Sequence, residues 1–146
     1  MKLAVMQVHD ALKRTIGNGS FDVQSARSEF DAINIDKGDC VFIQCKGVQL
    51  KAMEGNCSSL AHTATFWLEC VAREGLADDK QSEAASIVSQ VHAALSADYT
   101  LGGLVQDITP VNIGEYIPNG REFGSFTLEY DVTYWTPYND LNTILN

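Results

Sequence analysis

The first sixteen residues place their hydrophobic side chains at the spacing of an α-helix. The apolar residues recur every three or four positions, at Ala4, Val5, Val8, Ala11, Leu12 and Ile16. This period puts them on one face of a helix, and Gly17-Asn18-Gly19 follows as a stop signal. The pattern therefore predicts an amphipathic helix over residues 2–16.

A second run with the helical period is predicted over about residues 79–97. The apolar residues of its buried face are Ile87, Val88, Val91, Ala94 and Leu95. Asp78 and Asp79 stand where they can cap the first turn of this helix. Gln81 follows Asp78 by three residues, which is the spacing of a capping box.

Two segments alternate between apolar and polar positions, which is the period of a β-strand with one buried face. They predict strands over residues 62–73 and about 122–135. Residues 105–117 are also extended, and Pro110 within them indicates an edge position or a bulge because proline cannot donate to a central ladder. No helix lies between 105 and 135, so these last two strands form an antiparallel hairpin.

A compact apolar run at residues 40–45 and an alternating run at 48–52 predict a further hairpin. Lys46-Gly47 is expected to turn the chain between these two strands. Residues 20–40 show no sustained period and are expected to form a loop that contains a short turn or helix.

The order of elements predicts one α+β domain spanning residues 1–146. We expect a mostly antiparallel sheet of about four to five strands, with both amphipathic helices packed on one face. The polar second faces of the strands leave the other side of the sheet open to solvent or to a partner. A hairpin is expected to protrude at about residues 114–124.

Acidic and basic residues are distributed unevenly along the chain. The formal net charge is −9, and residues 1–73 contribute nothing to it because they hold eight basic and eight acidic groups. Residues 74–146 hold eleven acidic groups and only Lys80 and Arg121 as basic ones. A protein that binds nucleic acid or an anionic membrane needs a basic patch. Residues 74–146, the acidic half of the chain, supply none.

The hydropathy pattern contains no membrane span, since no run approaches about twenty apolar residues. Charged residues interrupt the first sixteen positions, so we expect no signal peptide there and a cytosolic location. In a reducing compartment the four cysteines are expected to be free thiols. Cys40 and Cys45 also fall on opposite faces of their strand, which argues against a shared metal ion.

Motifs for catalysis or cofactor binding are missing from the sequence. Neither glycine-rich phosphate loop nor the G-x-S-x-G elbow is present. The acidic cluster of Glu74, Asp78 and Asp79 stands at a helix start, where capping explains it. We therefore expect no catalytic residue, no cofactor and no metal.

The order of elements and the last third of the chain resemble the tail terminator proteins of long-tailed bacteriophages. The residues that carry the resemblance are the segment Leu104-Val105-Gln106-Asp107-Ile108, a variable hairpin tip, and Phe126 to Tyr134 ending in Thr136-Pro137. The resemblance implies a non-enzymatic virion protein that forms a ring, expected to be a homohexamer. That ring caps the tail tube, ends tail polymerisation and offers a surface to the head connector or head-completion protein.

A ring of this kind assembles in the host cytoplasm and becomes part of the virion, and the genomic DNA passes through it without specific binding. Carboxylates facing the channel would repel the phosphates. The expected channel residues are Asp107, Glu115, Glu122, Glu129 and Asp131. Ring closure requires heterologous contacts between subunits, for which we expect Tyr116, Arg121, Trp135 and Tyr138.

Two other functions remain open at this point. The chain could be another neck or tail-tube subunit or a head-completion subunit, which shares small size and ring assembly. Alternatively, Cys57 and His62 flank a loop and could form a thiol nucleophile with its base in a small cytosolic enzyme or ligand-binding module.

Overall fold

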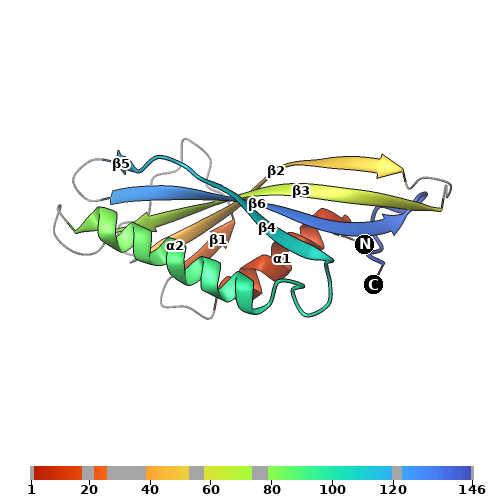
Figure 1. Ribbon diagram of the computed structural model, residues 1–146, viewed down its shortest axis with the longest axis horizontal. Coiled ribbons are helices and arrows are strands. Elements are labelled where there is room, and N and C mark those ends of the chain that lie inside the picture. Colours follow the sequence, from red (N-terminus) through yellow and green to blue (C-terminus); the bar gives the residue numbers. More distant parts are fainter. Residues whose placement is uncertain are drawn as a thin grey trace.

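The computed structural model describes residues 2–17, 22–25, 39–52, 58–73, 79–119 and 123–145. The elements follow one another as α1 (Ala4–Ile16), β1 (Asp22–Ser25), β2 (Cys40–Ala52), β3 (Ser59–Ala72), α2 (Lys80–Ala97), β4 (Asp107–Ile113), β5 (Ile117–Asn119) and β6 (Phe123–Pro137). Figure 1 shows a long twisted sheet with the two helices beside it. The chain has an α+β fold, as the sequence predicts.

The strands form a six-stranded sheet in the order β1-β2-β3-β6-β4, with β5 paired to β6. β1 runs parallel to β2, and every other pair is antiparallel. β4 and β5 pair with successive parts of the same side of β6, so together they form one edge of the sheet. The predicted hairpin between the last two long strands is confirmed, with β4 at the edge and an irregularity between Pro110 and Asn112.

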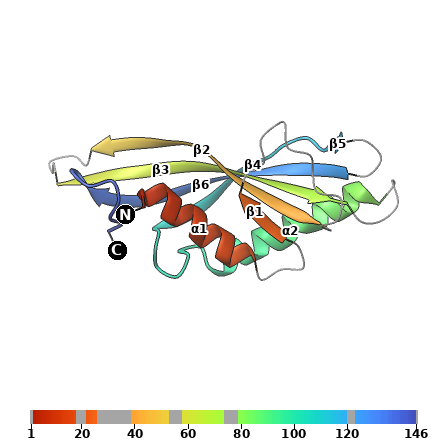
Figure 2. The same cartoon turned by 180° about the vertical axis from the view of Figure 1, so that it is seen from behind.

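Both helices lie on the same face of the sheet, as the two opposite views show (Figures 1 and 2). α1 packs on β1 and β2, α2 packs on β3 and β6, and the helices also touch each other. The predicted apolar stripe of α1 is buried, with Val8 and Leu12 completely covered. On α2 the covered residues include Ile87, Val91 and Leu95. Their burial against the sheet is the main stabilisation of these helices.

The two ends of the chain stabilise the start of α1. The Ala4 N–H, which has no acceptor within its own helix, donates to the Leu141 carbonyl at 2.9 Å. Leu145 forms a bridge with Trp135 at the end of β6, and Ile144 packs against the core. The apolar tail after β6 is therefore fixed against the domain.

The structure corrects two sequence predictions. Residues 40–52 form one continuous strand, and Lys46 is a bulge in it because the register with β3 shifts between Cys45 and Gly47. Gly47 has a φ of 145°, which lets the strand bend without turning back. Residues 22–25 of the expected loop are the strand β1, whose backbone pairs with the edge of β2.

The cap predicted for α2 is also different. Asp79 occupies the N-cap position but makes no side-chain hydrogen bond there. Asp78 lies outside the described residues, so the expected capping box with Gln81 is not part of the described structure.

Candidate functional site

The face of the sheet that the helices leave uncovered carries most of the predicted functional residues. Alternation along β3 buries Ala64, Phe66 and Leu68 under the helices and turns the residues between them to the other side. The same alternation in β6 places Glu129 and Asp131 on this open face. We call this surface, made by the outward residues of β2, β3, β6 and β4, the open face.

Two cross-strand hydrogen bonds hold the carboxylates of the open face. Thr65 Oγ1 donates to Asp131 Oδ1 at 2.8 Å, and Trp67 Nε1 donates to Glu129 Oε1 at 2.9 Å. In both pairs the two residues stand directly opposite each other in the ladder between β3 and β6. Each carboxylate is therefore oriented by an uncharged donor from β3.

The edge strand β4 adds a third carboxylate to this group. Asp107 pairs with Thr133 and Thr109 pairs with Asp131, which places both β4 residues on the open face. Thr109 Oγ1 donates to Asp107 Oδ2 at 3.2 Å. Within β4 and the described part of β6 there is no lysine or arginine, and Asp107, Glu129 and Asp131 form no ion pair with any described residue. This part of the open face is therefore acidic.

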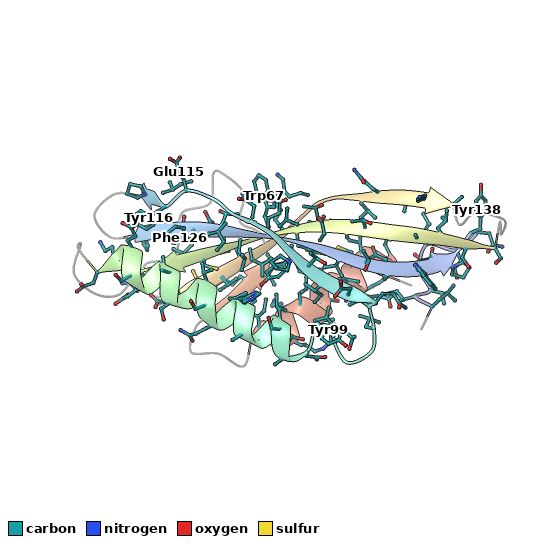
Figure 3. All side chains as sticks on the ribbon, in the orientation of Figure 1. Trp67, Tyr99, Glu115, Tyr116, Phe126 and Tyr138 are labelled. Atoms are coloured by element: carbon teal, nitrogen blue, oxygen red, sulfur yellow. The ribbon has the colours of Figure 1, made fainter. Side chains whose placement is uncertain are left out.

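The opposite side of the open face is basic. Lys46 and Lys51 lie on β2 and are exposed. The Lys46 ammonium stands 4.3 Å from the centre of the Trp67 ring, a cation–π contact. Trp67, 40% exposed, thus joins the basic and acidic halves of the face, and Figure 3 shows it on the side of the sheet away from α2. The sequence pattern placed Trp67 among polar neighbours but did not indicate these contacts.

The other predicted site residues are separated in space. Tyr116 is half-buried and its ring contacts Phe126, with 5.4 Å between centroids. Tyr138 is 54% exposed at the opposite end of the molecule (Figure 3). Trp135, 40% exposed, lies near Tyr138 on β6. Glu115 is exposed between β4 and β5.

Arg121 and Glu122, the remaining predicted residues, lie outside the described residues. They belong to the segment 114–124 that was expected to protrude as a hairpin. Within it, Ile117 to Asn119 pair with Ser125 to Phe123, so this part continues the edge of the sheet.

His62, considered above as the base of a thiol nucleophile, is a core residue. It lies within β3, is 4% exposed, and its ring stacks on Tyr134 with 4.7 Å between centroids. Its Nε2 is hydrogen bonded to Thr136 Oγ1 at 2.8 Å, and burial lowers the pKa of the imidazole below its usual value. Cys57 lies outside the described residues.

The described cysteines Cys45 and Cys70 are free thiols. Burial raises the pKa of Cys70 to about 12, so this thiol stays protonated and unreactive at neutral pH. As predicted, Cys40 and Cys45 lie on opposite faces of β2: Cys40 packs with Phe42 and Val71, and Cys45 packs against the main core.

A groove that sequence analysis did not indicate runs between α2 and the edge strand β4. Its volume is about 570 Å³; α2 contributes Val88, Ser89 and His92, and the other wall is made by residues 110–113 with Leu128. Val111 and Ile113 are 49% and 57% exposed. His92 Nδ1 is hydrogen bonded to the Tyr130 hydroxyl at 2.7 Å, which fixes the ring at the wall of the groove.

Comparison with known proteins adds no family assignment. The chain matches no protein-family model, and no curated protein is significantly similar to it in sequence. Among the described residues, no three His, Cys, Asp or Glu side chains come close enough to hold a metal ion. None of the helices in the described ranges is both long and apolar enough to cross a membrane.

Proposed function

We propose that this protein is a structural subunit of a bacteriophage virion, which forms a ring on the end of the tail tube. In this role it ends tail polymerisation and provides the surface that joins the tail to the head connector or head-completion protein. The ring is assembled in the host cytoplasm from identical subunits, expected to number six. The observation that carries the proposal is the acidic part of the open face, formed by Asp107, Glu129 and Asp131.

The open face suits the wall of a channel for DNA. Around Thr65, Glu129 and Asp131 it is a polar sheet surface, whereas the opposite face is covered by helices. If subunits are arranged with their helices outside, the carboxylates of β4 and β6 face the axis. The three carboxylates outnumber Lys46 and Lys51 of the same face. The net negative charge of that wall repels the phosphate backbone, so DNA moves past without being held.

The ends of the strands would then form the two rims of the ring. At one rim the chain exposes apolar side chains near its two termini: Leu3, Met6, Tyr138 and Leu141. Exposed apolar side chains that gather in one place are typical of surfaces that bind another protein. We propose that this rim, with Trp135 beside it, contacts the tail tube or the head connector.

Electron microscopy of capped tubes tests this function. Tail tubes are assembled from a purified tail-tube protein of the source genome, and the proposed ring subunit is added during polymerisation. We expect rings at one end of the tubes and shorter tubes with increasing protein. A variant with Tyr138→Ser and Leu141→Ser should lose capping, whereas Tyr99→Ser, an equally exposed tyrosine after α2, should cap normally.

Each alternative function has its own outcome in this experiment. Long filaments formed by the protein alone would identify it as a tube subunit and overturn the capping role. Tubes that keep their length and carry no ring, at any protein concentration, would also contradict the proposal. Selective labelling of one thiol by iodoacetamide near neutral pH would instead favour the thiol-dependent alternative.

A further inference from the structure

The sheet ends in two edges along which no further described strand is paired. β4 pairs with β6 on one side only. At the other edge, β1 covers β2 only as far as Ile43, so the stretch Gln44 to Ala52 pairs with β3 alone. Unpaired strand edges are templates for pairing with another chain.

The two free edges lie at the same height along the strands. Followed through the ladders of β6 and β3, Asp107 is level with Gln49 of β2. In the same way Asn112 is level with Gln44. Within one chain β4 runs in the direction opposite to β2. A second copy in the same orientation can therefore continue the sheet, with its β2 paired antiparallel to β4 of the first copy. The two copies then stand at the same height along the strands. β1 of that copy, which ends opposite Ile43, limits the pairing beyond Ile113.

The side chains of the two edges also match on the helix side of the sheet. Val48 and Leu50 stand opposite Ala64 and His62, both buried, so they are on this side. Leu50 is 51% exposed in the single chain. Beside β4, the same side of the sheet holds the apolar groove of about 570 Å³ that includes Ile113. Followed through the same ladders, Val48 is level with the buried Ile108, Leu50 with the start of β4, and Cys45 with Pro110 of the groove. Pairing of the edges therefore brings Val48 beside Ile108 and Cys45 to the groove, where their apolar surface is removed from water.

Charges match on the open face. Lys51 and Gln49 of β2 are on this face, and Asp107 of β4 is level with Gln49. Continuing the sheet therefore brings a lysine of one copy near an aspartate of the next. Two β4 edges, or two β2 edges, would lack this pair of opposite charges, because β4 carries no lysine or arginine and Gln44–Ala52 carries no aspartate or glutamate.

The helix layer agrees with the same arrangement. A neighbour joined through its β2 brings its own α1, which packs on β1 and β2, next to α2. The exposed residues of α2 include no aspartate, glutamate, lysine or arginine: they are Gln81, Ser82, Ala85, Ser86, Ser89, Gln90, His92, Ala93, Ser96 and Ala97. A helix can pack on this surface without desolvating a charge.

We propose that the edge strand β4 and its groove bind the free half of β2, Gln44–Ala52, of a second copy of this chain. The contact is heterologous, so each subunit uses one edge for each neighbour and the pattern continues until it closes. This contact between β4 and β2 places the open faces of all subunits on the same side of the joined sheet. This inference rests on the ring in the proposed function and names the surfaces that close it.

Two single substitutions test the contact, one at each edge. Leu50→Asp places a charge on the β2 edge, and Ile113→Asp places one at the groove. Both side chains are more than half exposed, so the folded subunit should tolerate them; unchanged circular dichroism and thermal unfolding will confirm this. Native mass spectrometry should then show a closed oligomer for the wild type and monomers for each variant. Tyr99→Asp, at a similarly exposed side chain away from both edges, should keep the oligomer.

Mixing the two variants gives the decisive measurement. Leu50→Asp retains an intact β4 edge and Ile113→Asp retains an intact β2 edge, so together they can form one native contact. We expect a one-to-one dimer of twice the 16.0 kDa chain mass, and nothing larger. A Leu50→Asp variant that dimerises alone would show pairing of two β4 edges and overturn the proposal.

The proposal also fails if the wild type is a monomer at its highest soluble concentration, or if either variant keeps the wild-type oligomer. Capping of tail tubes is scored separately on the same proteins. A wild type that caps tubes while both edge variants still form rings would leave the function standing and refute this contact. Closed rings that depend on both edges but never cap tubes would refute the function and leave the contact standing.

Discussion

The indole of Trp67 donates its Nε1 hydrogen to Oε1 of Glu129, directly across the ladder between β3 and β6. The same indole ring lies under the ammonium of Lys46 from β2. One aromatic side chain thus connects three neighbouring strands on the face that has no helix over it. The contact keeps Glu129 at a fixed position without neutralising it, because its hydrogen-bond donor is uncharged.

Trp67→Phe should weaken the fold modestly. It removes the hydrogen bond to Glu129 while keeping an aromatic ring for Lys46, and a single hydrogen bond contributes about 0.5–1.5 kcal/mol. We expect a loss near the lower end, since Trp67 is 40% exposed. Glu129→Gln keeps an acceptor oxygen and should change the free energy of unfolding by less than about 0.5 kcal/mol. Urea unfolding measures both, and equal stabilities for Trp67→Phe and the wild type would contradict this role.

The long strands could be predicted from the sequence because a period of two residues is maintained over many positions. β3 and β6 bury one face under the helices. Each of their residues therefore points either to the core or to the other side of the sheet, and the alternation of apolar and polar residues shows which. The same alternation correctly placed Glu129 and Asp131 on the polar side of their strand. A one-residue error would have moved them into the core.

Other features depend on contacts that no local pattern contains. Residues 22–25 have no alternation and are a strand only because the edge of β2 is beside them. To predict the groove between α2 and β4, one must know both the register of the edge strand and the position of the helix beside it. Tyr116 was expected at the surface, but Gly124 leaves room for its ring to lie against β6, where it contacts Phe126.

Gly47→Ala should destabilise the protein by about 1–2 kcal/mol, because a side chain disfavours positive φ. Gly47 has a φ of 145° at the bulge of β2, although no atom of the described residues lies within 4 Å of an added Cβ, so the cost is conformational and not steric. Gly114→Ala is the matched control: its Cβ would make an ordinary contact of 3.6 Å with the Thr127 carbonyl oxygen. Thermal unfolding should separate the two variants, and similar melting temperatures would show that the bulge tolerates a side chain.

Two buried tyrosines on β6 should respond oppositely to loss of their hydroxyl groups. The Tyr130 hydroxyl is hydrogen bonded to His92 at 2.7 Å, so Tyr130→Phe should cost about 1 kcal/mol. The Tyr134 hydroxyl is buried and has no hydrogen-bond partner among the described residues. Tyr134→Phe removes an unsatisfied polar group and should leave stability unchanged or raise it by up to about 1 kcal/mol. Chemical denaturation of both variants tests this, and a larger loss for Tyr134→Phe than for Tyr130→Phe would reverse the assignment.

His62 should make the protein less stable in mild acid. Burial lowers the pKa of its imidazole in the folded state below the ordinary value of 6.5. Between the two pKa values the unfolded chain binds more protons than the folded one, so stability rises with pH there. The contribution is therefore fully present above about pH 6.5 and is lost progressively as the pH falls below it.

Replacing His62 by Gln isolates this contribution. The amide can still hydrogen bond to Thr136 Oγ1, the partner that lies 2.8 Å from Nε2, but it does not titrate. We expect the free energy of unfolding to depend less on pH between about 5 and 7 in the variant than in the wild type. Urea unfolding across this range gives the two slopes, and the imidazole resonances of His62 give its folded-state pKa directly. Equal slopes, or a folded-state pKa above 6.5, would mean that the core does not exclude the charged imidazole.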